Sequence, residues 1–266
     1  MIFVYIIFFV VSFGASIVGA ICGIGGGVII KPVLDAFGVL SVSVIGFLSG
    51  CTVLAMSCYS VVRSKLSGTS SIDMATGTPL AIGAAIGGIA GKSMFQWVSS
   101  LFVDKNTVGA VQAITLGIIT LGTLIYTLKK NKIKTHHLKN IAACLIIGFI
   151  LGVASSFLGI GGGPINLVVL YFFFSMTTKV AAQNSLYIIL FSQAASFLMT
   201  VFTGTVPEVS WLLLAGMIVA GLLGGIAGRT INKRIDDRVV DRLFIVLMGL
   251  IILINVFNTV KYLGII

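Results

Sequence analysis

The chain has 266 residues, of which 58% are apolar and only 9% are charged, and it carries a formal net charge of +10 at pH 7. The polar side chains are too few to cover a water-facing surface. The composition therefore excludes a soluble globular protein and indicates a polytopic membrane protein. The basic residues lie in short segments between apolar runs, where they orient the chain and meet anionic lipid headgroups, which disfavours nucleic acid as a partner.

Eight apolar runs are long enough to cross the hydrocarbon core as helices, which takes roughly 18 to 25 residues. In chain order they lie near residues 1–22, 41–62, 72–91, 107–128, 139–158, 180–202, 209–228 and 240–260. The first run lacks the basic start and the small-residue cleavage site of a signal peptide, so we expect it to remain as the first span. The predicted fold is an all-α, multi-pass protein of the cell (plasma) membrane.

The two halves of the chain are copies of each other, a feature to be sought before any other. A shift of 136 positions places GIGGG at 23–27 on GIGGG at 159–163, and Ser49 on Ser185. A shift of 137 places GGIAGK at 87–92 on GGIAGR at 224–229. We therefore expect a first transmembrane repeat over 1–128, a basic cytoplasmic linker over 129–138 and a second transmembrane repeat over 139–266.

The basic residues predict that the two repeats are inverted in the membrane, because cytoplasmic segments are rich in Lys and Arg. The residues placed inside are Arg63, Lys65, Lys179, the lysines of 129–139 and the basic residues of 229–242, and those left outside are Lys92, Lys105 and Lys261. Segment 140–175 then starts and ends inside, yet it makes only about 54 Å of helix. Each repeat is therefore expected to hold a glycine-broken helical hairpin, formed by a long helix and a half-helix, and three further transmembrane helices.

The two GIGGG breaks are the predicted binding site. Each precedes a piece too short to span alone, Val28 to Gly38 or Pro164 to Ser175. A helix that starts there leaves its first N–H groups without partners, and glycine lets a ligand approach the backbone closely. Such helix ends attract anions, and broken helices at a repeat interface bind substrate in many secondary transporters. The expected substrate-binding glycines are Gly25, Gly26, Gly27, Gly161, Gly162 and Gly163.

Polar residues near the breaks complete the predicted site. Ser49, Asn184 and Ser185 are candidates to hydrogen-bond ligand oxygens, although neutral polar residues also join helices across a bundle. Lys31 has two interpretations: it neutralises a bound anion, or it extends toward the membrane surface from the end of a short helix. All acidic residues are expected in loops or at helix ends, which disfavours proton or cation pumping through buried carboxylates.

Other motifs indicate what the chain is not. The repeated GGIAG segments fit close helix packing. The sequence has no P-loop, no H-E-x-x-H, no G-x-S-x-G and no C-x-x-C, so we expect no catalytic residues, no metal site and no cofactor. The protein is therefore predicted not to be an enzyme.

With these motifs, the chain resembles the sulfite exporter TauE/SafE family of membrane permeases along nearly its whole length. The resemblance rests on the paired GIGGG motifs, on Pro32, on the stretch Gln183-Asn184-Ser185-Leu186, and on Arg63, Gly68 and Ile72-Asp73-Met74. It implies a permease or exporter for a small sulfur-containing anion such as sulfite or an organosulfonate, bound between the two breaks with alternating access. Two alternatives stay open: a membrane scaffold or accessory subunit, and a transporter for a different small ion.

Overall fold

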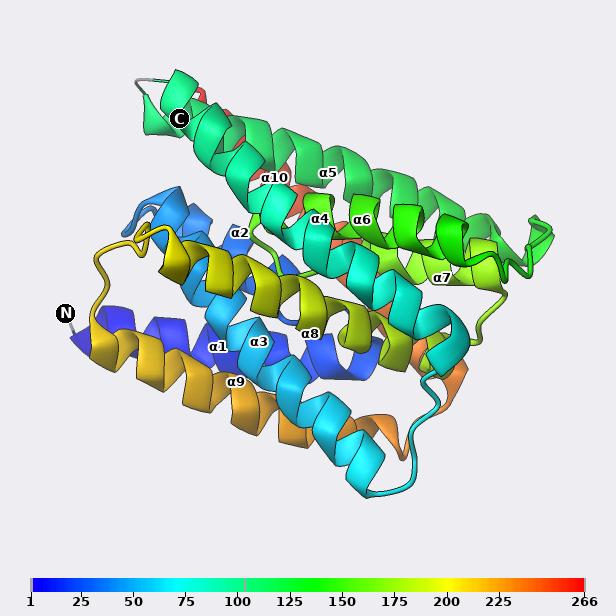
Figure 1. The fold of residues 1–266 in the computed structure, drawn as a ribbon. Coiled ribbons are helices and arrows are strands. Elements are labelled where there is room, and N and C mark those ends of the chain that lie inside the picture. The colour runs from blue at the N-terminus through cyan, green and yellow to red at the C-terminus, as the bar shows by residue number, and fades with distance from the viewer. Residues whose placement is uncertain (1, 103, 266) are drawn as a thin grey trace.

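A computed structural model describes residues 2–102 and 104–265, and all regular structure in this part of the chain is helical (Figure 1). The first half contains α1 (Ile2–Cys22), α2 (Gly27–Phe37), α3 (Val42–Leu66), α4 (Met74–Leu101) and α5 (Lys105–Lys129), followed by a 3-10 turn, η1 (Lys130–Lys132). The second half contains α6 (Ile141–Leu158), α7 (Pro164–Phe174), α8 (Thr178–Phe202), α9 (Trp211–Asn232) and α10 (Asp237–Tyr262). Eight helices are long and apolar enough to cross a membrane, which confirms the predicted all-helical, polytopic fold.

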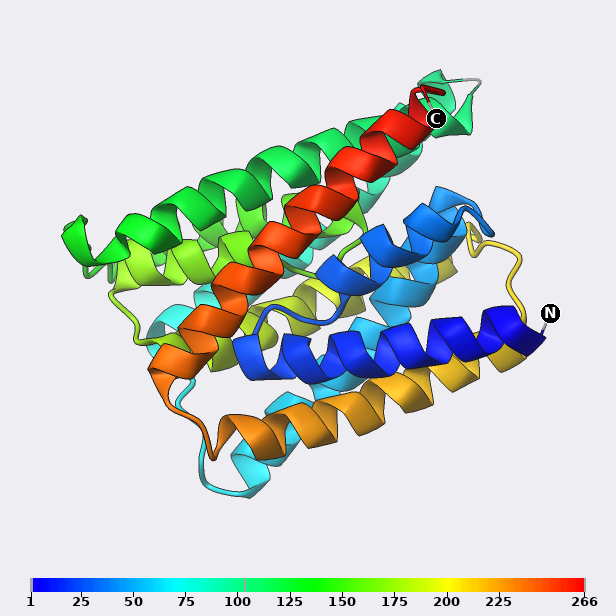
Figure 2. The same cartoon turned by 180° about the vertical axis from the view of Figure 1, so that it is seen from behind.

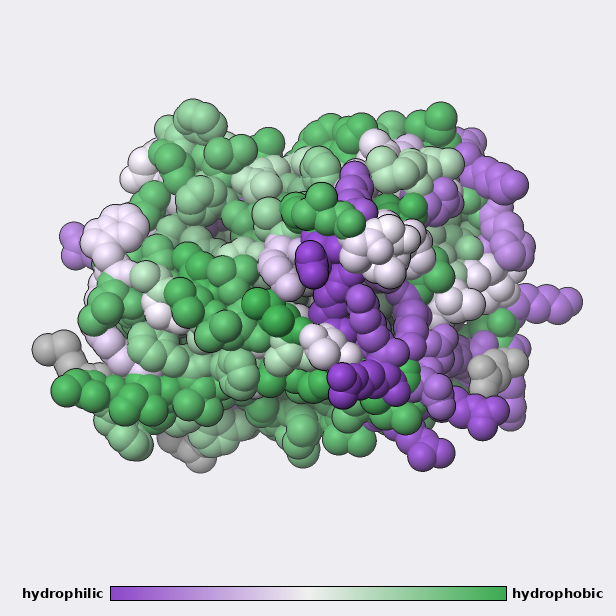
Figure 3. Space-filling view, turned by 90° about the horizontal axis from the view of Figure 1, so that it is seen from below, coloured by the Kyte–Doolittle hydropathy of each residue, from purple (hydrophilic) through white to green (hydrophobic). Residues whose placement is uncertain are grey.

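The order of helix lengths is the same in both halves: one long helix, one helix of 11 residues and three long helices. Figures 1 and 2 show both chain termini at one end of the bundle, while the linker after α5 and the turn between α9 and α10 lie at the other. Hydrophilic residues gather at this second end in Figure 3, and apolar residues cover most of the remaining surface on that face. The opposite membrane orientation of the two repeats stays a prediction.

The halves interlock through glycine-lined helix pairs, because α4 lies along α6 and α9 lies along α1. A Cβ atom added at Gly87 of α4 would lie 2.1 Å from the carbonyl oxygen of Phe149. The repeat-related contact is equally close, since a Cβ added at Gly224 would lie 2.4 Å from the carbonyl oxygen of Phe13. The GGIAG segments therefore pack helices backbone to backbone, as predicted, and each half holds the first helix of the other.

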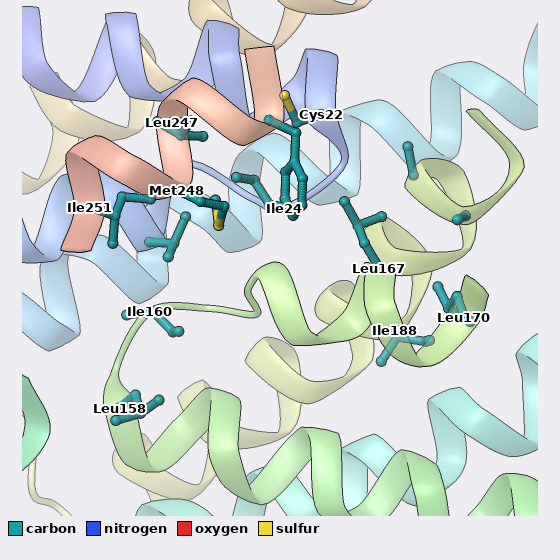
Figure 4. Packing of buried hydrophobic residues seen from close by; sticks show 14 of the residues in the cluster. Cys22, Ile24, Leu158, Ile160, Leu167, Leu170, Ile188, Leu247, Met248 and Ile251 are labelled. Carbon is teal, nitrogen blue, oxygen red and sulfur yellow. The ribbon is translucent and has the colours of Figure 1, made fainter. Parts of the chain in front are cut away.

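The centre of the bundle is formed where α3 and α8 pack on each other beside the two glycine breaks. The isoleucines of the breaks, Ile24 and Ile160, belong to one buried apolar cluster with Leu167 of α7 and Met248 of α10 (Figure 4). The breaks therefore lie inside the protein and not against lipid, which is the condition for irregular backbone at membrane depth.

One predicted span boundary is wrong. The fourth helix, α4, does not end near residue 91 but continues to Leu101, so Lys92 lies inside a helix and not in an outer loop. Hydropathy falls at a lysine and so ends the apolar run, whereas the backbone stays helical past Lys92, whose side chain lines a cavity within the protein.

Candidate functional site

The two GIGGG segments begin with the same left-handed glycine conformations and differ in backbone conformation from their fourth residue on. Gly23 and Gly25 have φ angles of 74° and 69°, and their repeat counterparts Gly159 and Gly161 have 65° and 68°. These left-handed conformations favour glycine because other residues meet a steric penalty from Cβ. The helix after the first break begins at Gly27, one residue before the expected Val28, and the helix after the second begins at Pro164 as expected.

The two breaks touch each other. A Cβ added at Gly27 would lie 2.0 Å from the carbonyl oxygen of Ile160, and one added at Gly25 would lie 3.4 Å from the carbonyl oxygen of Gly161. Within the described residues, the recorded hydrogen bonds use none of the N–H groups of 25–27 or 161–163. Six backbone N–H groups in the two adjoining breaks therefore lie buried without a recorded partner.

Two repeat-related apolar side chains pack on the breaks from α3 and α8. Val53 and Ile189 are both fully buried. Val53 would lie 3.1 Å from a Cβ added at Gly25, and Ile189 would lie 2.2 Å from one added at Gly162. Close packing at this level separates the space on one side of the breaks from the space on the other.

A narrow cavity lies on the side of the chain termini, next to the first turns of α3 and the last turns of α8. We call it the Lys92 cavity. It has a volume of about 40 Å³, and its lining includes Lys31, Phe47, Lys92, Gln112, Ser156, Gly159, Gln193, Phe197 and Thr200. Through Gly159 it reaches the second glycine break.

A wider cavity lies at the opposite end of α3 and α8, on the side of the basic linker. We call it the Arg229 cavity. It has a volume of about 430 Å³, and its lining includes Ala20, Ser60, Val61, Ser64, Lys179, Ala182, Gln183, Arg229 and Lys233. It reaches the first glycine break through Ala182, whose Cα lies 2.2 Å from the position of a Cβ added at Gly23.

The two cavities are repeat copies of each other. Several lining residues of one correspond to lining residues of the other at shifts of 136 or 137: Gly46 and Ala182, Phe47 and Gln183, Lys92 and Arg229, Ser60 and Ser196, Val61 and Phe197, and Ser64 and Thr200. Sequence comparison of the halves gives this correspondence, but only the fold shows that the matched residues enclose two cavities at opposite ends of the bundle.

The predicted polar residues have different surroundings. Ser49 is fully buried, has no recorded hydrogen-bond partner for its hydroxyl, and its Oγ lies 2.9 Å from the position of a Cβ added at Gly27. Ser185 is likewise fully buried on α8 with an unpartnered hydroxyl. Asn184 instead holds the loop before α4: its Oδ1 accepts from the Asp73 N–H at 3.3 Å, and its Nδ2 donates to the Ser71 carbonyl at 3.2 Å.

Lys31 forms a buried ion pair, which corrects the expectation about acidic residues. Its Nζ lies 2.7 Å from Asp35 Oδ2, one helical turn away on α2, and both residues are buried. Asp35 does lie near the end of its helix, but it is not solvated, because α2 is enclosed in the bundle and contacts α10. The Lys31 side chain also approaches Gly159 of the second break, with Cε 3.4 Å from an added Cβ.

Four residues that border the candidate site are not among those predicted from the sequence: Lys92, Arg229, Val53 and Ile189. The signal for the two cations was present, because each ends a GGIAG segment in its own repeat. The signal for Val53 and Ile189 was absent, because a valine and an isoleucine in apolar helices are indistinguishable from ordinary packing residues.

The comparisons with known proteins agree with this architecture. The family model described as sulfite exporter TauE/SafE matches residues 8–254, so the chain belongs to that family of membrane transporters. The chain is also 23% identical over 250 residues to the probable membrane transporter protein YunE of Bacillus subtilis (strain 168), an alignment that covers 86% of this chain and 88% of that protein. No solved structure matches the chain.

Proposed function

We propose that this member of the TauE/SafE family transports a small sulfur-containing oxyanion, such as sulfite or an organosulfonate, and binds it where the two GIGGG breaks meet. The proposed binding residues are Gly25, Gly26, Gly27, Lys31, Ser49, Gly161, Gly162, Gly163 and Ser185. Asn184 remains in the proposal as the residue that holds the adjoining loop in place. The observation that carries the proposal is that cations, and no carboxylates among the described residues, line both cavities beside the breaks.

Electrostatics favour an anion at each step toward the breaks. Lys179, Arg229 and Lys233 line the wide cavity, and a cleft lined by charges of one sign concentrates ions of the other. At the breaks, the starts of α2 and α7 supply free N–H groups and the partial positive charge of helix N-termini. The unpartnered hydroxyls of Ser49 and Ser185 are further donors that an oxyanion can accept from.

The unequal cavities support alternating access. On the narrow side, the rings of Phe47 and Phe197 stack with centroids 6.3 Å apart at an angle of 23°. On the wide side, the repeat-related positions carry Gln183 and Val61, which line the cavity without such a stack. In the proposed cycle the larger cavity on the Arg229 side is the accessible one in this structure, and exchange of the two conformations between the repeats opens the Lys92 side.

Transport by purified protein in proteoliposomes tests this proposal. We expect saturable uptake of ³⁵S-sulfite that methanesulfonate inhibits and sodium chloride does not. In the double variant Ser49→Ala/Ser185→Ala, uptake should fall while thermal stability stays the same or rises, because each hydroxyl is buried without a partner in the folded protein.

The two alternatives predict different results. A scaffold or accessory subunit gives no saturable flux of any ion. A transporter for another ion gives flux that sulfite and methanesulfonate do not inhibit, and competition by sulfate, phosphate or cations then identifies its class. Either result overturns the proposed substrate.

A further inference from the structure

We propose that Lys92 and Arg229 are paired oxyanion-docking residues, one in each cavity, that bind the same substrate in turn on opposite sides of the glycine breaks. The inference rests on the proposed function, because it concerns the same anion on its way to and from the central site. It assigns a side-specific role to two residues that lie outside the breaks.

Lys92 is a cation without a carboxylate partner among the described residues. It is partly buried, and its Nζ lies 5.6 Å from the centre of the Phe95 ring. The same cavity contains Ser156, whose buried hydroxyl also lacks a recorded partner. A cation without a carboxylate partner and a hydroxyl without a recorded partner in one cavity are suited to bind an anionic oxygen.

Arg229 is a cation held in place by neutral groups. Its Nη1 donates to the Ser60 carbonyl at 2.8 Å, and its Nη2 donates to Ser67 Oγ and Thr69 Oγ1, both at 3.1 Å. These bonds fix the guanidinium without neutralising it and use three of its five N–H donors. The remaining donors and the full positive charge are left for a ligand in the wide cavity.

The two cations occupy equivalent positions in the glycine-lined helix pairs, α4 with α6 and α9 with α1. Lys92 follows Gly91, where an added Cβ would lie 2.4 Å from the Val153 carbonyl oxygen. Arg229 follows Gly228, where an added Cβ would lie 2.3 Å from the Ile17 carbonyl oxygen. Each cation therefore directly follows a glycine of the close helix pair, α4 with α6 or α9 with α1, through which the two halves pack together.

Repeat position distinguishes this pair from the other cations of the cavities. The counterparts of those cations are neutral: Lys31 corresponds to Leu167, Lys179 to Ser43, and Lys233 to Gln96. Lys92 and Arg229 are the cavity cations that occupy matched positions. A docking step needed on both sides of an alternating-access transporter requires such a matched pair, whereas a cation that only orients the chain does not.

The proposal predicts side-specific affinity. In proteoliposomes, the fraction of protein in each orientation is determined by external trypsin cleavage of the exposed linker, and the half-saturating sulfite concentration is measured from each face. Lys92→Gln should raise it roughly tenfold, equivalent to about 1.4 kcal/mol, from the Lys92 face alone, and Arg229→Gln should do so from the Arg229 face alone. Lys92→Arg and Arg229→Lys, which keep the charge, should restore most of the affinity.

The control is Lys134→Gln, which removes an exposed charge from the linker and should leave both faces unchanged. If Lys92→Gln does not fold, Lys92→Met keeps the apolar stem and serves in its place. Wild-type affinity of the neutral variants at both faces, or an equal loss at both faces, overturns the docking pair while leaving the proposed function intact. Absence of sulfite and sulfonate flux in the wild-type protein overturns the proposed function instead.

Discussion

The contact between the two glycine breaks can be tested by a single methyl group. In Gly27→Ala, the new Cβ would lie 2.0 Å from the Ile160 carbonyl oxygen, a distance that real Cβ atoms do not adopt. The second break must therefore move by about 1 Å to reach even 3.0 Å. Overpacking of this kind costs about 1–3 kcal/mol, and if that cost separates the two sets of N–H donors, substrate affinity falls roughly 5- to 150-fold.

The matched control is Gly249→Ala on α10, where an added Cβ meets no atom within 4 Å. Alanine is favoured over glycine inside a helix by about 1 kcal/mol, so this variant should be as stable as the wild type or more so, with unchanged transport. Sulfite binding by isothermal titration calorimetry and uptake in proteoliposomes are measured for both variants, together with thermal unfolding in detergent.

We expect Gly27→Ala to lose affinity for sulfite while the protein remains folded and monodisperse. Wild-type affinity and uptake in a folded Gly27→Ala protein would refute the placement of the site at the meeting point of the breaks. If Gly27→Ala does not fold, the same measurements are made on Gly26→Ala. There the added Cβ lies 3.1 Å from Ser16, so the strain is smaller and a weaker loss of affinity is expected.

Two further predictions concern the narrow cavity and the buried ion pair. Phe197→Ala removes an aromatic stack worth about 0.5–1.5 kcal/mol. In a protein whose other cysteines are replaced, a membrane-impermeant maleimide should then label Cys51, which lines the Lys92 cavity, severalfold faster. An unchanged labelling rate contradicts a closing role for the stack. Lys31→Met alone or Asp35→Leu alone should lower the free energy of unfolding by about 3–5 kcal/mol, because each leaves a buried charge without its partner. The double variant should recover most of that lost stability. Additive losses in thermal unfolding contradict that coupling.

The sequence predicts the elements that depend on local physics. Runs of apolar residues define the spans, and a triple glycine before a half-length apolar piece defines each break. It does not predict features that depend on contacts between the halves. The burial of Asp35 requires α10 to cover α2, and the orientation of Asn184 requires the loop before α4 to lie across the start of α8. Charge and polarity alone therefore do not predict that Asp35 is buried or that Asn184 bonds to a loop of the other half.

The two repeats share the order of their helices but differ in the side chains that line their cavities, and under the proposed function this difference bears on which state the protein favours. On the Lys92 side, Phe47 and Phe197 stack in the lining of the cavity. On the Arg229 side, Gln183 occupies the position of Phe47 and binds the loop that Arg229 also holds, accepting from the Ser71 N–H at 2.9 Å. In the proposed alternating-access cycle the stack separates when the Lys92 side opens, so its aromatic contact would stabilise the present state by about 0.5–1.5 kcal/mol. That difference shifts the two populations by roughly 2- to 13-fold, so a bound anion with modest differential affinity is enough to reverse it.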